Sequence, residues 1–172
     1  MLKLIVFSGL PGTGKSTLAE RVGKQQRVPV FAKDWLEANL LSNGLVPTIT
    51  AKPLGFASYD LLTTLAERQL MLGQSVILDS VASTETIRDA WRQISKQYGA
   101  DWRVIECVCS DQAMHRARLV RRKRNIPGWH ELTWSDVEKV KQYYAVWEED
   151  HLILDMVNPF EENLFKASAY CE

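Results

Sequence analysis

The sequence predicts a doubly wound α/β domain, in which a parallel sheet lies between two layers of helices. Three observations support this class: short apolar runs rich in Val and Ile, helix-period segments between them, and a glycine-rich loop directly after the first run. Short runs with little alternation of polar and apolar residues are typical of parallel strands that are buried on both faces. Strands and helices that alternate at this spacing are joined by right-handed crossovers.

Each expected element is bounded by its apolar pattern and by turn or cap residues. The expected strands are residues 2–7, 28–32, 75–78, 102–109 and 152–154. The expected helices are residues 16–25, 34–41, 57–72, 84–98, 111–124 and 135–149. Asn43-Gly44 and Gly73 are expected to end helices, because Asn and Gly tolerate a left-handed backbone. Ser135 and Glu138 have the spacing of a capping box at the start of the last expected helix.

Composition and charge are those of an ordinary globular chain. The 172 residues are 46% apolar, and 21 basic residues balance 21 acidic ones. A chain without net positive charge lacks the electrostatic footprint of a protein that coats nucleic acid, so nucleic acid is a less favoured partner than a small molecule. No segment approaches the roughly 18 uninterrupted apolar residues of a membrane span. We therefore expect one cytoplasmic domain over residues 1–172, whose oligomeric state the sequence leaves open.

The loop after the first expected strand carries the strongest functional motif. It reads Gly-Leu-Pro-Gly-Thr-Gly-Lys-Ser and matches the phosphate-binding pattern G-x-x-x-x-G-K-[ST] in full. Gly9, Gly12 and Gly14 let the backbone curl so that amide groups point at the β- and γ-phosphates of ATP. Lys15 supplies positive charge to the same oxygens, and the Ser16 hydroxyl is a ligand for Mg²⁺. The preceding strand and following helix favour this interpretation over an ordinary glycine-rich turn. The expected nucleotide-binding residues of the loop are Gly9, Pro11, Gly12, Thr13, Gly14, Lys15 and Ser16.

Two carboxylates stand at the ends of expected strands. Asp79 closes the third strand, where a Walker B aspartate holds Mg²⁺ directly or through water; the alternative is a loop or N-cap residue. Asp34 follows the second strand, and ligand chemistry collects beyond the carboxyl ends of parallel strands. Asp34 is therefore a candidate general base for an attacking hydroxyl, a candidate helix N-cap, or both. Trp35 beside it is a candidate wall of an acceptor pocket.

A basic run follows the fourth expected strand. Residues 116–124 contain six cations. Arg118 and Arg122 are four positions apart and would share one helix face, where guanidinium groups suit contact with a transferring phosphoryl group. Three interpretations compete: a phosphate-binding lid, a solvated helix face and a nucleic-acid patch. Pro127 and Gly128 favour the lid, because they offer a hinge directly behind the run.

Taken together, these motifs resemble the P-loop kinase group that contains polynucleotide 5′-hydroxyl kinase, chloramphenicol phosphotransferase and the zeta toxins, and in particular its small bacterial members. The resemblance extends over nearly the whole chain and rests on residues 9–17, 33–34, 66–79, 106–122, 133–134 and 152–155. It implies a three-layer P-loop NTPase fold with strand order 2-3-1-4-5 and a small helical lid at about residues 115–133.

The same resemblance implies roles for individual residues. Asp34 would be the general base, and Thr17 would join Lys15 and Ser16 in binding phosphate and Mg²⁺. Arg118 would lie near the adenine and Arg122 near the phosphates. The loop of residues 156–159 would border the base.

One departure from the group concerns the acceptor. Relatives that act on phosphate-bearing acceptors often carry an arginine one turn beyond the aspartate, and here that position is Glu37. Asp34 and Glu37 on one helix face would repel an anion unless Lys33 or Lys52 offsets them. The sequence thus favours an ATP-dependent kinase for a neutral or cationic hydroxyl compound, such as a sugar, nucleoside or amino-alcohol. The alternatives are a 5′-hydroxyl polynucleotide kinase and a nucleotide-binding module without transferase activity.

Overall fold

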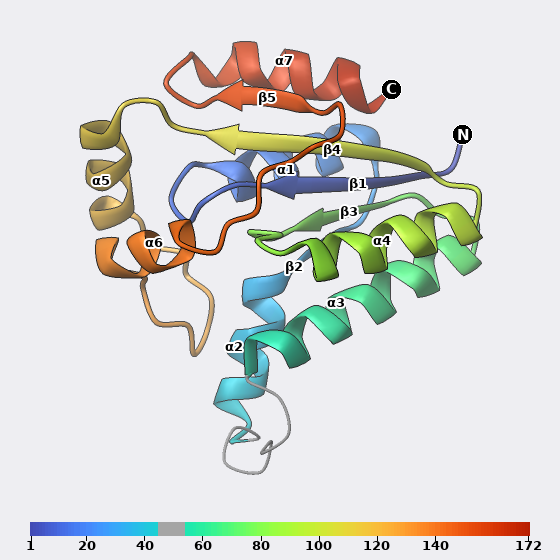
Figure 1. The fold of residues 1–172 in the computed structure, drawn as a ribbon, viewed down its shortest axis with the longest axis horizontal. Coiled ribbons are helices and arrows are strands. Elements are labelled where there is room, and N and C mark those ends of the chain that lie inside the picture. Colours follow the sequence, from blue (N-terminus) through green and yellow to red (C-terminus); the bar gives the residue numbers. More distant parts are fainter. Residues whose placement is uncertain (45–53) are drawn as a thin grey trace.

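The computed structural model describes residues 1–44 and 54–172, in which five strands form a parallel sheet between helical layers (Figure 1). The strands are β1 (Lys3–Ser8), β2 (Val30–Ala32), β3 (Val76–Asp79), β4 (Asp101–Val108) and β5 (Leu152–Asp155). Their order across the sheet is β2-β3-β1-β4-β5, which confirms the order that the resemblance implied. The helices are α1 (Lys15–Gln26), α2 (Lys33–Ser42), α3 (Leu54–Met71), α4 (Glu85–Gln97), α5 (Gln112–Arg121), α6 (Trp134–Lys141) and α7 (Phe160–Cys171).

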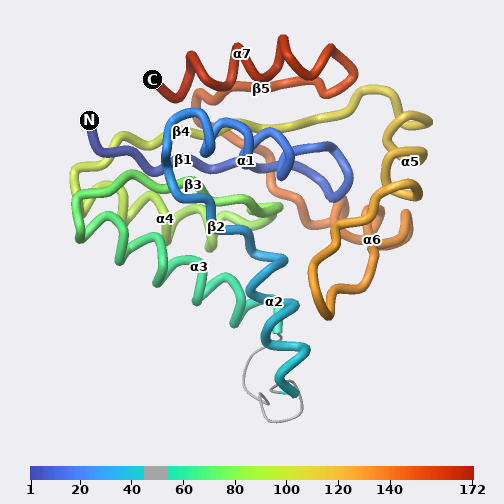
Figure 2. The backbone as a smooth tube through the Cα atoms, turned by 180° about the vertical axis from the view of Figure 1, so that it is seen from behind, coloured from blue at the N-terminus to red at the C-terminus, as the bar shows by residue number. Residues whose placement is uncertain are grey.

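The central strand β1 is buried on both faces, as its apolar sequence predicted. Leu4 and Val6 pack in one core cluster, with residues of α3 and α4. Ile5 and Phe7 pack in the other, with residues of α1 and α7. Figure 2 shows α1 and α7 on the side of the sheet away from α3 and α4. The sheet therefore needs apolar side chains at residues 4–7 of β1, which is why this run shows no alternation.

The strand registers bring the candidate site residues to one edge of the sheet. Asp79 at the end of β3 pairs with Phe7 of β1 and with Ala32 of β2. Since all strands are parallel, the glycine loop, Asp79 and the start of α2 leave the sheet at the same level. In Figure 1 the strand arrows point toward α5 and α6, which lie at this edge.

Two predicted helices end earlier than expected. The basic helix α5 ends at Arg121, so Arg122 lies outside it with an extended backbone. Helix α6 ends at Lys141 rather than at residue 149. The Ala145 amide group, which a longer helix would direct at the Lys141 carbonyl, instead donates to the Ser83 carbonyl at 2.8 Å, and the Ala145 carbonyl accepts from Arg88. These long-range contacts hold the segment after Lys141 outside a helix.

The cap and turn predictions have mixed outcomes. Gly44 and Gly73 both have a positive φ just after a helix, as predicted. The predicted capping box of Ser135 with Glu138 is wrong, because Thr133 caps α6 and Asp136 closes the box two residues earlier. Helix α7 was not predicted. Among the described helices, none is long and apolar enough to cross a membrane.

Candidate nucleotide and acceptor site

The glycine loop has the curled backbone that its motif predicts. Gly9, Gly12 and Gly14 have φ values of 131°, 88° and 105°, in the left-handed region that favours glycine. At Gly9 a Cβ atom would lie 2.2 Å from the carbonyl oxygen of Cys107, so no side chain fits. Helix α1 starts at Lys15, and its N-cap Gly14 offers no side chain to its first-turn amide groups. These amide groups are therefore available to an anion.

Lys15 and Asp79 form a buried pair of opposite charge beside the loop. Burial lowers the pKa of Lys15, while Asp79 and Asp34 oppose that shift. Burial raises the pKa of Asp79, while the Lys15 charge and the Ser16 hydroxyl oppose it. Oδ1 of Asp79 is buried and has no hydrogen-bond partner among the described residues.

The donor set of Asp79 and Ser16 fits a magnesium ion. A hard cation beside Ser16 would satisfy the unpartnered carboxylate oxygen, because carboxylate and hydroxyl oxygens are suitable ligands for Mg²⁺. The described part of the chain contains no group of three or more His, Cys, Asp or Glu that could hold a metal. Mg²⁺ in nucleotide sites needs no such group, since it takes one or two protein ligands together with phosphates and water.

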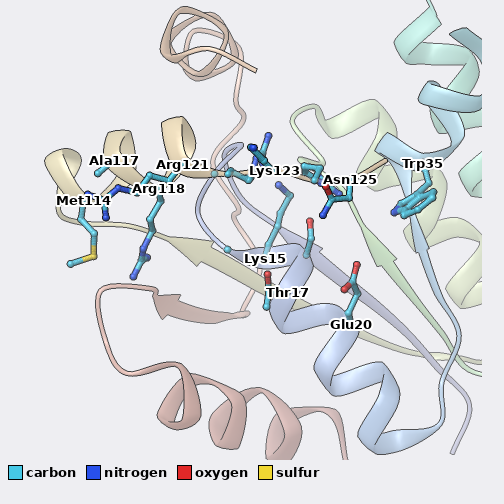
Figure 3. A pocket seen from close by; sticks show the side chains of 15 residues that line it. Lys15, Thr17, Glu20, Trp35, Met114, Ala117, Arg118, Arg121, Lys123 and Asn125 are labelled. Carbon is cyan, nitrogen blue, oxygen red and sulfur yellow. The ribbon is translucent and has the colours of Figure 1, made fainter. Parts of the chain in front are cut away.

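A cavity of about 840 Å³ opens in front of the loop. In Figure 3, Lys15 lies between Arg118 of α5 on one side and Trp35 of α2 on the other. Ser16 and Thr17 also line the cavity. Its remaining cations come from the predicted basic run: Arg121, Arg122, Lys123 and Arg124. A cavity with this many cations next to open amide groups is suited to a polyphosphate.

Three predicted residues of the loop lie away from this cavity. Gly9 and Thr13 line a separate hollow of about 370 Å³ behind the loop, and Pro11 lines a third cavity. The Thr13 hydroxyl donates to the carbonyl oxygen of Leu10 at 3.0 Å, so it supports the turn itself. Trp35 lines the large nucleotide-sized cavity and is not among the residues around the cavity at Pro11.

Both predicted lid arginines line the cavity, but only one of them lies in helix α5. Arg118 is on α5, and its Nη1 donates to the carbonyl oxygen of Met156 at 2.7 Å, which brings it to the loop after β5. Arg122 follows α5, so the prediction that both share one helix face is wrong. Nε and Nη2 of Arg122 are buried and have no hydrogen-bond partner among the described residues. Nε lies 3.7 Å from a carboxylate oxygen of Glu131, an ion pair too long for a hydrogen bond, so both nitrogens can still donate to phosphate oxygens.

Asp34 lies in the first turn of α2 and forms an ion pair with Arg124. The N-cap of α2 is Ala32, so the interpretation of Asp34 as that cap is wrong. Its partner Arg124 lines the same cavity as Lys15 of the glycine loop, and the charge of Asp34 opposes the lowering of the Lys15 pKa. The partner Arg124 was not predicted, because 90 positions separate it from Asp34.

The Glu37 carboxylate does not stand as an unpaired negative charge. It forms an ion pair with Lys33, one turn earlier on α2, which is one of the two compensations that the sequence suggested. Lys52, the other, lies outside the described residues.

His115 supports the glycine loop from behind. Its Nε2 lies 2.8 Å from the carbonyl oxygen of Pro11, and its ring meets the edge of Trp134 with centroids 5.1 Å apart. Burial lowers the pKa of His115, which favours the neutral ring. Since the Pro11 carbonyl only accepts, the Nε2–H group donates. Sequence reasoning gave His115 no role, because no local pattern links it to a loop 104 positions away.

The chain is similar to a known protein family and to several solved structures. A family model described as "AAA domain" (AAA_33) matches residues 4–147, a range that includes the loop, both carboxylates and the basic run. The chain belongs to this AAA domain family. No curated protein matches the sequence.

Three solved structures share the fold of this AAA domain. A sugar kinase from Janibacter sp. HTCC2649 has a TM-score of 0.74 at 17% identity, over 99% of this chain and 95% of that one. A gluconokinase from Sinorhizobium meliloti 1021 has a TM-score of 0.70 at 18% identity, over 97% and 90%. An APS kinase from Mycobacterium tuberculosis, in complex with AMPPNP and APS, has a TM-score of 0.66 at 17% identity, over 99% and 97%.

These likenesses establish the P-loop kinase fold. None of the three is a polynucleotide kinase, a chloramphenicol phosphotransferase or a zeta toxin, so the narrower resemblance stays a prediction.

Proposed function

We propose that this AAA domain is an ATP-dependent phosphotransferase that moves the γ-phosphate of ATP to a hydroxyl group of a small molecule. The observation that carries the proposal is the position of Asp34. Its charge acts on the P-loop residue Lys15, and its partner Arg124 lines the cavity suited to phosphates. A carboxylate paired with a residue that lines a phosphate-binding cavity is suited to act as general base for an attacking hydroxyl.

The nucleotide would be held mainly by backbone groups and cations. Amide groups of Gly12 and of residues 14–16, together with the Lys15 ammonium, would bind the β- and γ-phosphates. Arg118 would lie toward the adenine, and the unpartnered donors of Arg122 would bind the γ-phosphate. Ser16 and Asp79 would hold Mg²⁺, with Thr17 beside them, and the ion would neutralise charge on the phosphates. Residues 115–133 would act as the lid.

Asp34 would accept the proton of the acceptor hydroxyl as its oxygen attacks the γ-phosphorus, and ADP would leave. Arg124 holds Oδ2 of the carboxylate, while Oδ1 accepts no hydrogen bond from the described residues. One carboxylate oxygen is therefore oriented by its partner and the other is open to a hydroxyl group.

The compared structures support a kinase for small molecules, because their names give a sugar kinase, a gluconokinase and an APS kinase. The nucleic-acid interpretation of the basic run gains no such support. Arg118 and Arg121 to Arg124 line the phosphate cavity, which accounts for their clustering without a polynucleotide.

The test is label transfer from [γ-³²P]ATP with Mg²⁺ to sugars, nucleosides and amino-alcohols. Asp34→Asn should bind ATP like the parent protein and lose transfer by roughly 10²- to 10⁴-fold, the usual contribution of a general base. Lys15→Ala should lose ATP binding. Asp89→Asn is the matched control, because Asp89 is also an aspartate paired with an arginine on a helix, but lies on the surface.

Two results would contradict the proposal. Full transfer by Asp34→Asn would remove Asp34 from the mechanism. Tight ATP binding by the parent without transfer to any compound would favour a nucleotide-binding module.

A further inference from the structure

The cavity at Pro11, the third one described above, lies on the other side of the glycine loop from the phosphate cavity. It has a volume of about 470 Å³, and Pro11 of the loop forms part of its wall. Lys33 and Glu37 of α2 line it as well, on either side of Asp34 along the chain. The charge of Asp34 also acts on Tyr59, another residue of the wall. An occupant would therefore lie beside the proposed general base and across Pro11 from the phosphate cavity.

The wall of this cavity is mainly aromatic and aliphatic. Phe56 and Tyr59 come from α3, Trp129 and His130 from the segment before α6, and Tyr143 from the segment after it. Phe56 and Tyr143 are 51% and 56% exposed, so two large aromatic side chains face solvent in the absence of a ligand. Aromatic walls with open faces are suited to a flat apolar body, because burial of both surfaces removes them from water.

The described part of the wall offers no free cation to an anionic group. Lys33 is paired with Glu37 and also lies 5.7 Å from the ring centroid of Tyr59. The wall has a further carboxylate, Asp136, whose Oδ2 accepts hydrogen bonds from Thr133 at 2.9 and 2.7 Å. This cavity differs in charge from the phosphate cavity, which is lined by Lys15 and five further basic residues. A phosphate or carboxylate on the ligand would be desolvated here without compensation.

We propose that this cavity holds the phosphate acceptor, and that the acceptor is an uncharged alcohol with an aromatic or similarly flat ring. The proposal rests on the phosphotransferase function above and names its substrate class. The hydroxyl proton passes to the Asp34 carboxylate, a bond forms between the hydroxyl oxygen and the γ-phosphorus, and the bond from that phosphorus to the β–γ bridging oxygen breaks. The electron pair of the broken bond leaves with ADP.

The experiment compares four sets of compounds that differ in ring and charge. Nucleosides and aryl alcohols are the neutral ring set, and their phosphorylated or carboxylated analogues are the anionic ring set. Pentoses and pentose phosphates are the corresponding sets without a flat ring. Binding is measured by saturation-transfer NMR on the full chain with AMPPNP and Mg²⁺, and turnover is measured separately by label transfer from ATP.

Phe56→Ala is the informative variant, and Phe165→Ala is its matched control. Both are exposed helical phenylalanines, on α3 and α7, and Phe165 lies outside the described walls of the cavities. The neutral ring set should give the strongest binding. Phe56→Ala should weaken that binding, and raise KM in turnover, by about tenfold, whereas Phe165→Ala should leave both unchanged.

Binding and turnover separate the two proposals. Preferential binding of anionic or ringless compounds, or an equal response of the two phenylalanine variants, would overturn the acceptor class. Binding of the neutral ring set without any label transfer would support the cavity and overturn the phosphotransferase function.

Discussion

Arg88 offers a quantitative test of how the wall of the proposed acceptor cavity is held. Its side chain is fully buried, and its guanidinium donates to the carbonyl oxygens of Ala82, Ala145 and Val146 at 2.8, 2.7 and 3.0 Å. The Arg88 Cζ atom also lies 3.6 Å from the ring centroid of Trp147. The side chain thus joins the loop after β3 to the segment after α6. Residues of both, including Val81 and Tyr143, line the cavity at Pro11.

Replacing Arg88 with Met keeps much of its volume and removes every donor. Three carbonyl groups, of which that of Ala82 is buried and the other two are part-buried, then lose charge-assisted hydrogen bonds, and each buried polar group left unpaired costs about 1–3 kcal/mol. The neighbouring backbone can relax in part and the two part-buried carbonyl groups can turn to water, so we expect Arg88→Met to lower the free energy of unfolding by about 2–4 kcal/mol. For a chain of this length, the melting temperature should fall by roughly 10 °C.

Urea denaturation followed by circular dichroism measures this loss, provided that the m-value stays constant. Arg92→Met is the matched control one turn along α4. Arg92 is partly exposed and pairs with surface carboxylates of Glu85, Asp89 and Glu149, so its loss should cost about 1 kcal/mol or less. A loss below about 1 kcal/mol for Arg88→Met, or equal losses for the two variants, would refute the reasoning.

Two further predictions concern the glycine loop. Gly9→Ala should lower the free energy of unfolding by at least about 2 kcal/mol and abolish ATP binding, because its Cβ would meet the Cys107 carbonyl at 2.2 Å. The control is Gly55→Ala, whose Cβ would have no other atom within 4 Å, and which should cost no stability in the same urea titration. Burial lowers the pKa of His115 below its usual 6.5, so the stability that the neutral ring contributes is present above pH 6.5 and is lost as the pH falls toward the lowered pKa. We compare urea midpoints at about pH 7.5 and about pH 5.5, and His115→Gln, which can still donate to Pro11, should show a smaller difference between them than the parent protein. An unchanged difference would assign the acid sensitivity to other groups.

The sheet was predictable from sequence because its strands are short apolar runs, and residues 4–7 of β1 and all of β3 are buried. Each of the five strands lies within two residues of its expected range. The end of α6 was not predictable, since the helical pattern continues to residue 149 and the contacts that hold the following segment outside the helix come from the distant Ser83 and Arg88. Helix α7 did carry a signal, because Leu164, Ala167 and Cys171 recur at helical spacing and are buried.

One part of the candidate site is encoded by neighbouring residues, and another part depends on contacts between residues far apart in the sequence. The loop conformation is encoded within eight residues, and three of its glycines have the predicted left-handed backbone. The pairing of Asp34 with Arg124 and of His115 with Pro11 joins residues 90 and 104 positions apart. No local pattern encodes such contacts, because they exist only after the strands have brought both partners to one edge of the sheet.

The strand order explains why one side of the loop is basic and the other is not. Strand β1, which leads into the loop, lies in the middle of the sheet, with β3 and β2 on one side and β4 and β5 on the other. The basic run follows β4 and reaches the loop from the second side, whereas α2 and α3 flank β2 and β3 and approach from the first. Gly12 and Pro11, adjacent in sequence, accordingly line different cavities. Under the proposed function, a hydroxyl from the apolar side and a γ-phosphate from the basic side would meet at the edge of this loop, with the attacking oxygen about 3–3.5 Å from the phosphorus.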